Sequence, residues 1–243
     1  MLASAPSVSG GNNMKKVIFW DFDGTLVKSN QSFLNALTAA FSESGLSIEE
    51  KAAMAFLREN CSWYHPERSY EKATGEAWWQ ELLKKLQKLS TEMGVPVDKI
   101  EKIGEAFRKN AVSYPYVLLD GAEEALKESK ALGFENYILS NNFPELTDRI
   151  SELGLSQYFE EVILSTNVGY EKPREEIFSY ARQLAGAPDQ PIMVGDNPIA
   201  DIRGARDAGF LTVYLGTAPC EDADYVCREL SEIPGLLRTL SRR

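Results

Sequence analysis

The chain has 243 residues, enough for one large domain or two modest ones, and 44% of them are hydrophobic, which supplies a substantial core. Its formal net charge of −10 argues against general nucleic-acid binding, which needs a basic surface. The three cysteines, Cys61, Cys220 and Cys227, form no CxxC pair, a pattern typical of reduced thiols in a cytoplasmic protein. A single histidine argues against a histidine-rich metal site, and no apolar run reaches the length of a membrane span.

The first thirteen residues are small and polar and lack the basic and apolar regions of a signal peptide. We expect residues 1–13 to be a disordered N-terminal extension. Residues 17–20, Val-Ile-Phe-Trp, form an unbroken β-prone apolar run. Such a run predicts a buried strand of a parallel sheet.

Two carboxylates, Asp21 and Asp23, follow this strand directly. Residues i and i+2 on a strand point the same way, so both should emerge at its C-terminal end, where open α/β sheets bind ligands. Two acids this close repel each other unless a cation lies between them. Mg²⁺ is a hard ion that prefers such oxygen ligands, although an ordinary Asp-Gly turn would give the same pattern.

Residues 29–115 show a helical pattern throughout. Apolar residues recur at helical spacing over about 33–45, 50–57, 75–93 and 98–110, without a strand pattern between them. Ser47 and Glu50 match a capping box ahead of the second segment. The stretch carries 11 Lys and Arg against 12 Asp and Glu, whereas residues 116–243 carry 12 against 22. We therefore expect an all-helical insertion whose surface differs from that of the rest.

Helix and strand patterns alternate after Pro115. Helices are expected at 121–132, 145–153, 173–185 and 198–208, strands at 137–139, 162–164, 192–194, 211–214 and 225–226, and a last helix at the C-terminus. Repeated units of this kind predict an α/β fold with a doubly wound, Rossmann-like parallel sheet. Because the first strand precedes the insertion, residues 14–28 and 116–243 should form one core that residues 29–115 interrupt.

Polar residues follow two further strands of this core. Strand 137–139 runs into Ser140, Asn141 and Asn142, which can donate hydrogen bonds to an anionic oxygen, although Ser and Asn are also ordinary helix caps. Strand 192–194 runs into Asp196, which would approach the same ion as Asp21. Asp201 falls in the next helical turn, where it would orient a neighbour or simply favour the helix dipole.

Lys172 stands just before the helix at 173–185. A lysine there can offset the charge of a phosphate group, with help from the helix N-terminus. Most lysines are simply solvated, so this residue alone indicates little. Lys172 becomes informative together with the polar groups at Asp21, Ser140 and Asp196. All four positions are expected at the edge of the sheet where the strands end.

Taken in order, these motifs resemble those of the haloacid dehalogenase superfamily of aspartate-nucleophile phosphohydrolases. The insertion resembles the helical cap that phosphoglycolate phosphatase-like members carry between the first and second motifs. Only about thirty residues separate the second motif from the third, so we expect no second cap. The matching residues are Asp21-Phe22-Asp23-Gly24-Thr25, Ser140-Asn141, Lys172-Pro173, and Gly195-Asp196-Asn197 with Asp201.

The resemblance implies a role for each matched residue. Asp21 would attack phosphorus and form an aspartyl-phosphate, and Asp23 would act as general acid and then base. Mg²⁺ would be held by the Asp21 carboxylate, the Asp23 backbone carbonyl and Asp196. The residues implied to bind the phosphoryl oxygens are Ser140, Asn141 and Lys172, and the supporting ones are Thr25, Asn197 and Asp201.

Several alternatives bear on the function. Dehalogenase members lack the second aspartate, so Asp23 argues for a phosphate ester. Sugar-phosphate mutases share both aspartates and a helical cap and remain an alternative, although Thr25 favours the phosphatases. A phospho-accepting receiver would be much shorter, and a non-enzymatic interaction module is not favoured because every motif position is retained. We expect a Mg²⁺-dependent hydrolase of a small phosphorylated metabolite, monomeric or homodimeric, with no nucleic-acid or membrane partner.

Substrate choice is expected to lie in the helical insertion. Its 61–70 stretch offers Trp63, Tyr64, His65 and Arg68 as candidates, although Trp63 and Tyr64 would also suit the interior of a helical bundle. The nearly neutral charge of the insertion avoids added repulsion of an anionic substrate. Aromatic residues that can stack on a base slightly favour a nucleotide over phosphoglycolate or a sugar phosphate.

Overall fold

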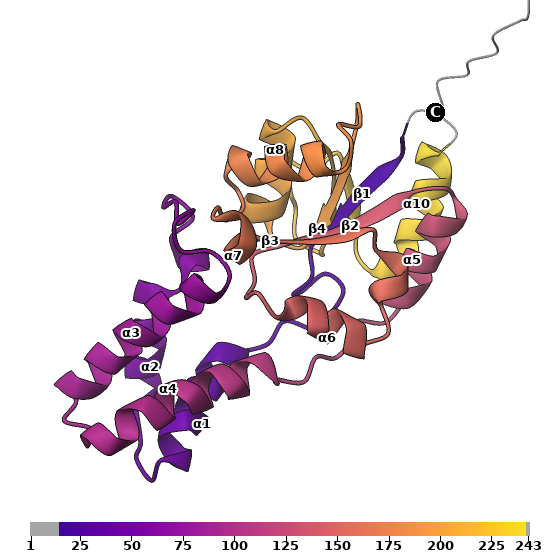
Figure 1. The fold of residues 1–243 in the computed structure, drawn as a ribbon. Helices are drawn as coiled ribbons and strands as arrows, with labels where there is room; N and C mark the ends of the chain where they lie inside the picture. The colour runs from indigo at the N-terminus through magenta and orange to yellow at the C-terminus, as the bar shows by residue number, and fades with distance from the viewer. Residues whose placement is uncertain (1–14, 242–243) are drawn as a thin grey trace, which may run out of the picture.

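The computed structural model describes residues 15–241, and its centre is a six-stranded parallel sheet (Figure 1). The strand order is β3-β2-β1-β4-β5-β6, so the first strand of the chain lies in the middle of the sheet. The expected Rossmann-like fold is therefore confirmed. The strands are β1 (Val17–Trp20), β2 (Glu135–Ser140), β3 (Glu161–Leu164), β4 (Ile192–Gly195), β5 (Leu211–Leu215) and β6 (Tyr225–Cys227).

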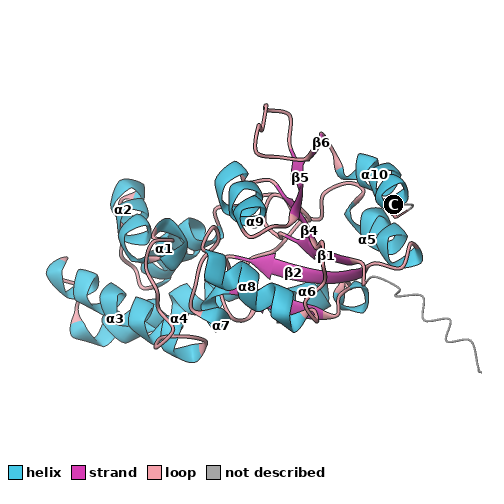
Figure 2. Cartoon of the chain, turned by 90° about the horizontal axis from the view of Figure 1, so that it is seen from above, coloured by secondary structure: helices cyan, strands magenta, loops and turns pink. Residues whose placement is uncertain are grey.

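Both faces of β1 are covered by helices. Ile18 and Trp20 pack toward α5 (Ala122–Ala131), α6 (Leu146–Glu152) and α10 (Ile233–Leu240). Phe19 packs on the other side toward α8 (Glu175–Leu184) and α9 (Gly204–Asp207). Helices on both sides of the sheet are visible in Figure 2. Two buried faces explain why the strand is apolar at every position instead of alternating.

Four helices lie between β1 and α5, and together they form a separate helical unit beside the sheet (Figure 1). Its apolar cluster includes Leu37, Trp79 and Phe107. The capping box expected at Ser47 and Glu50 is wrong, because α2 follows Glu49 with no described side chain capping it. The helices are α1 (Ser32–Glu43), α2 (Glu50–Asn60), α3 (Glu76–Glu92) and α4 (Val97–Val112), with a short 3₁₀ turn, η1 (Ser62–Tyr64).

The two connections between the helical unit and the sheet run side by side. Val27 forms an antiparallel bridge with Leu118, and the Lys28 N–H donates to the Val117 carbonyl at 2.8 Å. The Leu119 N–H donates to the carbonyl of Leu26 at 2.9 Å. The chain therefore passes from the core to the helical unit and back through two adjacent segments, residues 26–28 and 117–119, which we call the paired linker.

A second attachment lies in residues 66–75, which we call the strap. The Tyr70 N–H donates to the Gly169 carbonyl at 3.0 Å, and the Gly75 N–H donates to the Thr166 carbonyl at 2.8 Å. Both acceptors lie in or just after α7 (Ser165–Val168), which follows β3. Main-chain hydrogen bonds thus join the helical unit to the core far from the paired linker.

Close packing reinforces the strap. Gly169 has a φ of 92°, and a Cβ at this position would lie 2.6 Å from the Glu71 Cα, so only glycine fits. The Tyr70 hydroxyl donates to Glu171, a carboxyl group that is fully buried. The strap therefore covers a buried acid with its own tyrosine.

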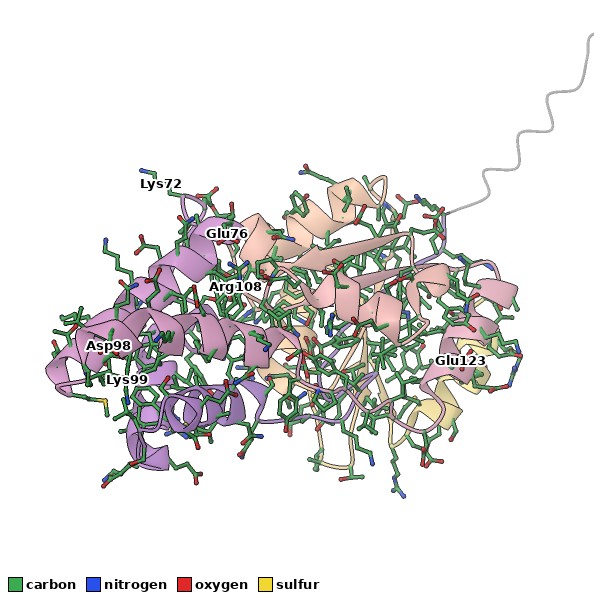
Figure 3. All side chains as sticks on the ribbon, turned by 60° about the horizontal axis from the view of Figure 1, so that its bottom comes forward. Lys72, Glu76, Asp98, Lys99, Arg108 and Glu123 are labelled. Carbon is green, nitrogen blue, oxygen red and sulfur yellow. The ribbon has the colours of Figure 1, made fainter. Side chains whose placement is uncertain are left out.

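A third contact joins the far side of the helical unit to the loop before α6. Arg108 Nη2 lies 2.7 Å from Glu145 Oε1, and the same guanidinium donates two bonds to Glu76, at 2.8 and 2.6 Å. Figure 3 shows Glu76 and Arg108 close together. Trp79 Nε1 donates to Glu145 Oε2 at 2.8 Å, and Phe143 belongs to the apolar cluster of the helical unit.

The helix expected over 198–208 is split. Residues Pro198–Arg203 form a π-helical turn, η3, and only Gly204–Asp207 are α-helical. Asn197 Oδ1 accepts from the Ile199 and Ala200 N–H groups, and the Asp201 side chain turns back to accept from the Asn197 N–H at 3.0 Å. Such turns are often found at functional sites.

Two further 3₁₀ turns, η2 (Ser156–Tyr158) and η4 (Leu230–Glu232), complete the elements. Across residues 15–241, no helix combines the length and apolar character that crossing a membrane requires. The extension expected at residues 1–13 lies outside the described residues.

Candidate active site

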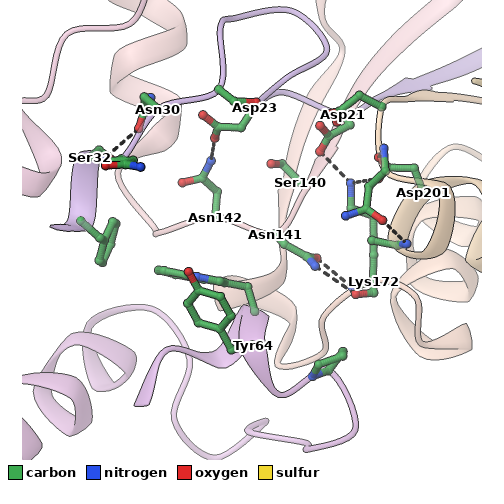
Figure 4. A pocket seen from close by; sticks show the side chains of 18 of the residues that line it. Asp21, Asp23, Asn30, Ser32, Tyr64, Ser140, Asn141, Asn142, Lys172 and Asp201 are labelled. Carbon is green, nitrogen blue, oxygen red and sulfur yellow. Dashed lines mark hydrogen bonds and ion pairs between the residues drawn. The ribbon is translucent and has the colours of Figure 1, made fainter. Parts of the chain in front are cut away.

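A cavity of about 660 Å³ lies at the carboxyl ends of the central strands, between the sheet and the helical unit (Figure 4). This volume is in the range of small-molecule sites. The sheet side contributes Asp21, Asp23, Ser140, Asn141, Asn142, Lys172, Asp196, Asn197 and Asp201, and the helical side contributes Asn30, Gln31, Phe33, Met54, Trp63 and Tyr64, among others.

Asp21 is fixed at the end of β1 by its main chain and its side chain. Its N–H donates to the Val194 carbonyl at 2.9 Å, which extends the ladder between β1 and β4. Oδ1 accepts from Lys172 Nζ at 2.8 Å, and Oδ2 accepts from the Thr25 hydroxyl at 3.2 Å. The Asp21 side chain is only 10% exposed, and these bonds hold its carboxylate in one orientation.

Lys172 is the positive centre of the site. Nζ donates to Asp21 Oδ1, to Asp201 Oδ1 at 2.6 Å and to the Leu139 carbonyl at 2.6 Å. Burial by itself lowers the pKa of this ammonium, but the carboxylates of Asp201 and Asp21 outweigh it and raise the pKa above its ordinary value. The side chain therefore stays charged although it is buried.

Asn141 holds the main chain of Lys172. Its Nδ2 donates to the Lys172 carbonyl at 3.0 Å, and its Oδ1 accepts from the Lys172 N–H at 2.8 Å. Both ends of the amide are therefore engaged. These two bonds hold the Lys172 main chain in place, and the expected contact of Asn141 with a phosphate group stays a prediction.

Asp23 lies in a different environment from Asp21. Its Oδ2 accepts from Asn142 Nδ2 at 2.6 Å. Burial and the charge of Asp21 raise the pKa of this carboxyl to about 7, although the hydrogen bond from Asn142 opposes the shift. Asp23 is thus able to carry a proton near neutral pH while facing the same cavity.

Three carboxylates, one of them that of Asp21, converge in the cavity. Oxygen atoms of Asp21, Asp196 and Asp201 lie within 4.8 Å of one another. Burial and the charge of Asp21 raise the pKa of Asp196 to about 6. Gly24 allows this approach, because at its φ of 88° a Cβ would lie 2.3 Å from Asp196 Oδ2.

The donor set fits a hard divalent cation, which takes carboxylate oxygens and relieves their mutual repulsion. Both oxygens of Asp201 are already engaged, one by Lys172 and one by the Asn197 N–H at 3.0 Å. Asp21 and Asp196 therefore have the more available lone pairs. The Thr25 hydroxyl lies between them, 3.5 Å from Asp196 Oδ1.

The candidate specificity residues divide into two pairs. Trp63 and Tyr64 line the cavity, whereas His65 and Arg68 are not among its described lining residues. His65 Nε2 lies 3.0 Å from the Glu59 carbonyl, and Arg68 pairs with a neighbouring glutamate at the surface. Trp63 is half-buried among the aromatic rings of the helical unit, and Tyr64 is 44% exposed.

Sequence reasoning gave no role to Tyr116 and predicted for Asn142 only a hydrogen bond to an anionic oxygen, although both residues line the cavity. The only signal for Asn142 was its place in the polar run after β2. Ser140 is buried at the cavity wall, and its role as a phosphate ligand stays a prediction. Asn197 instead caps η3 through its side chain.

Comparison with known proteins places this geometry in a family. The phosphoserine phosphatase of Thermus thermophilus is 36% identical over 126 residues, 51% of this chain and 50% of that protein. The pyrimidine 5'-nucleotidase YjjG of Escherichia coli is 37% identical over 120 residues, 47% and 51% of the two chains. The chain thus spans about half the length of these two relatives.

Among solved structures, the magnesium-bound putative HAD-hydrolase YfnB of Bacillus subtilis superimposes with a TM-score of 0.65 at 21% identity, over 93% of this chain and all of that one. At this identity the match shows a shared fold. The sequence model of haloacid dehalogenase-like hydrolases matches residues 15–209, which include every residue of the cluster around Lys172. This chain therefore belongs to the haloacid dehalogenase-like hydrolases.

Proposed function

We propose that this chain hydrolyses small phosphomonoesters through an aspartyl-phosphate on Asp21, with Mg²⁺ as cofactor. The observation that carries the proposal is the position of the Lys172 ammonium, 2.8 Å from the Asp21 carboxylate at the floor of a cavity. A nucleophilic carboxylate and a phosphate group repel each other, and a fixed positive charge beside them offsets that repulsion.

Asp21 is the proposed nucleophile. The bonds from Lys172 and Thr25 hold its carboxylate in one orientation. An Asp21 oxygen attacks phosphorus, and the bond between phosphorus and the leaving oxygen breaks. Ser140 at the cavity wall and Lys172 supply donors for the phosphoryl oxygens.

Asp23 is the proposed acid and base. Its raised pKa of about 7 leaves a proton available near neutral pH, and this proton goes to the leaving oxygen. The resulting carboxylate then takes a proton from water as that water attacks the aspartyl-phosphate. This second step releases phosphate and restores both aspartates. Asn142 keeps the Asp23 side chain turned to the cavity.

Mg²⁺ would be held by the carboxylates of Asp21 and Asp196 and by the backbone carbonyl of Asp23. When bound, it supplies positive charge that draws the phosphoryl group toward the carboxylate. Asp201 is a proposed positioning residue, because one of its oxygens accepts a hydrogen bond from Lys172 and the other accepts one from the Asn197 N–H.

The helical unit of residues 29–115 is the proposed cap on this site. It lies over the cavity and contributes residues to the wall that faces the scissile bond. A cap excludes water and contacts the leaving group, which favours small substrates. The cytoplasmic location and the monomeric or homodimeric state remain predictions from the sequence.

The test is release of phosphate from p-nitrophenyl phosphate and from a panel of phosphorylated metabolites, with Mg²⁺ and with excess EDTA. We expect turnover that requires Mg²⁺ and that Asp21→Asn abolishes, because an amide cannot form the acyl-phosphate. Asp189→Asn, the same change at an exposed site, should retain full activity. Hydrolysis that survives EDTA would remove the metal from the proposal, and hydrolysis that survives Asp21→Asn would remove the nucleophile.

A further inference from the structure

The cavity that holds the proposed catalytic residues has an unusual balance of charge. Among the described residues that line it, Lys172 is the only Lys, Arg or His. Four lining residues are acidic: Asp21, Asp23, Asp196 and Asp201. The one ammonium is already shared by Asp21 and Asp201 at 2.8 and 2.6 Å.

The single ammonium of Lys172 can offset the charge of one phosphoryl group, but no other described lining side chain can offset a second negative charge. Lys172 lies at the floor beside Asp21, so it serves the group that is transferred. The wall contributed by the helical unit carries no cation among its described residues. An anionic leaving group would therefore face several carboxylates at short range without a partner, which is unfavourable in a partly buried site.

The side chains on that wall suit an uncharged group. Met54, Trp63 and Tyr64 present apolar and aromatic surface. Asn30 adds a neutral donor, because its Nδ2 is buried with no hydrogen-bond partner within residues 15–241. Its Oδ1 accepts from the Ser32 N–H at 2.8 Å, which fixes the amide (Figure 4). A buried donor of this kind needs a hydrogen-bond partner, which a hydroxyl or carbonyl oxygen of an uncharged ligand can supply.

We propose that the substrate is a phosphomonoester whose leaving group is uncharged, and that esters bearing a carboxylate or a second phosphate on the leaving group are rejected. The proposal rests on the proposed phosphatase function and adds the chemical class of its substrate. Selection comes from the wall of the cavity that the helical unit contributes. Its described residues include no Lys, Arg or His that could pair with a negative charge on the leaving group.

The experiment compares three aryl phosphates on the full chain with Mg²⁺. These are p-nitrophenyl phosphate, 4-carbamoylphenyl phosphate and 4-carboxyphenyl phosphate, of which the last two differ mainly in one negative charge. We expect kcat/KM for the carbamoyl ester to exceed that for the carboxylate ester by about tenfold or more, the size of effect that one unpaired charge at this range produces.

A charge-introducing variant locates the effect. Gln31 lines the cavity, is exposed, and makes no side-chain hydrogen bond at the start of α1 among the described residues. Gln31→Lys should narrow the carbamoyl-to-carboxylate ratio by about threefold or more, because the new ammonium faces the leaving group. Gln87→Lys adds the same charge at an exposed site on α3 outside the lining and should leave the ratio unchanged.

The outcomes separate the two proposals. If none of the three esters is hydrolysed, the phosphatase function fails and this inference fails with it. If p-nitrophenyl phosphate is hydrolysed and the carboxylate ester is used as well as the carbamoyl ester, the function stands and the inference is overturned. The same holds if Gln87→Lys changes the ratio as much as Gln31→Lys. The wild-type comparison decides the question even if a variant does not fold.

Discussion

Asp21 and Asp23 are two residues apart, yet their side chains meet different partners. Asp21 is held by an ammonium and Asp23 by the amide of Asn142. A positive neighbour favours the ionised carboxylate, whereas burial and a nearby negative charge favour the protonated one. The two carboxyl groups therefore lie in different environments within one short stretch of chain, which is the basis for proposing different roles for them, as in other enzymes that use paired carboxyl groups.

The first prediction concerns the proton on Asp23. Asp23→Asn should slow steady-state hydrolysis of a nucleoside monophosphate by about 10²–10⁴-fold, because the leaving alkoxide needs a proton. A single-turnover burst of p-nitrophenolate should survive, since this anion leaves unprotonated. Rapid quench measures both. Asp21→Asn should show no burst, and a burst lost equally in both variants would contradict separate roles.

The second prediction separates Asp196 from Asp201. Asp196→Asn should raise the Mg²⁺ concentration needed for half-maximal activity by more than the about 10–100-fold that loss of a supporting residue typically costs, because a proposed ligand is lost. Asp201→Asn should mainly lower kcat, because the ion pair that orients Lys172 is weakened. A Mg²⁺ titration at saturating substrate distinguishes the two. The reverse order of effects would mean that their roles are exchanged.

The sequence predicted that Asp21, Asp23 and Asp196 lie together because each follows a strand, whereas Lys172 was recognised by its place before a helix, in the loop between α7 and α8. It did not identify the partners of the asparagines. Asn142 and Asp23 are 119 positions apart, and Asn141 contacts Lys172 across 31 positions. Such pairs depend on how strand ends pack side by side, and a single sequence carries no local signal for them.

At the scale of elements, strands were the most predictable. Their apolar runs are continuous because helices cover both faces, and the observed bounds differ from the expected ones by only a residue or two. Errors occurred where side chains override local propensity. The helix expected at 198–208 is split at a turn in which the Asp201 carboxylate accepts hydrogen bonds from the Asn197 N–H and from Lys172 Nζ.

The third prediction concerns η1. Tyr64 is exposed at the cavity, so Tyr64→Ala should lower kcat/KM for uridine 5'-monophosphate by about tenfold, the typical loss when an aromatic contact to a base is removed. The effect on p-nitrophenyl phosphate should be smaller. Arg68→Ala, a surface change nearby, should alter neither substrate by more than about twofold. Equal losses in both variants would remove η1 from substrate recognition.

The whole molecule is held together across its two parts by the paired linker, the strap and the Arg108 contact. Glu171 lies between the strap and the core, fully buried, with its Oε2 lacking a partner within residues 15–241. Burial raises the pKa of this carboxyl, against the opposing hydrogen bonds of Ser62 and Tyr70. The group therefore binds its proton more tightly in the folded chain than in the unfolded one.

The fourth prediction follows from this shift. A carboxyl whose folded pKa is raised contributes stability below its unfolded pKa, about 4.3, and that stability is lost as the pH rises through the folded pKa. The side chain of Glu171→Gln stays neutral at every pH. The free energy of unfolding of the variant, relative to that of the wild type, should therefore be higher at pH 8 than at pH 5. Urea unfolding at both values measures the gain. Glu105→Gln, an exposed counterpart, should show none, and a flat difference for Glu171→Gln would contradict the prediction.

The strap also bears on how such proteins exchange modules. An insertion joined only by its two ends can be transplanted between relatives by cutting at the paired linker, near residues 28 and 116. Here the graft would carry Tyr70 and Glu71 away from Gly169 and Glu171, which stay behind in the core of the donor. A recipient with any side chain at 169 would collide with the incoming strap. Recombination of this helical unit therefore requires a third, matched crossover in the loop after β3.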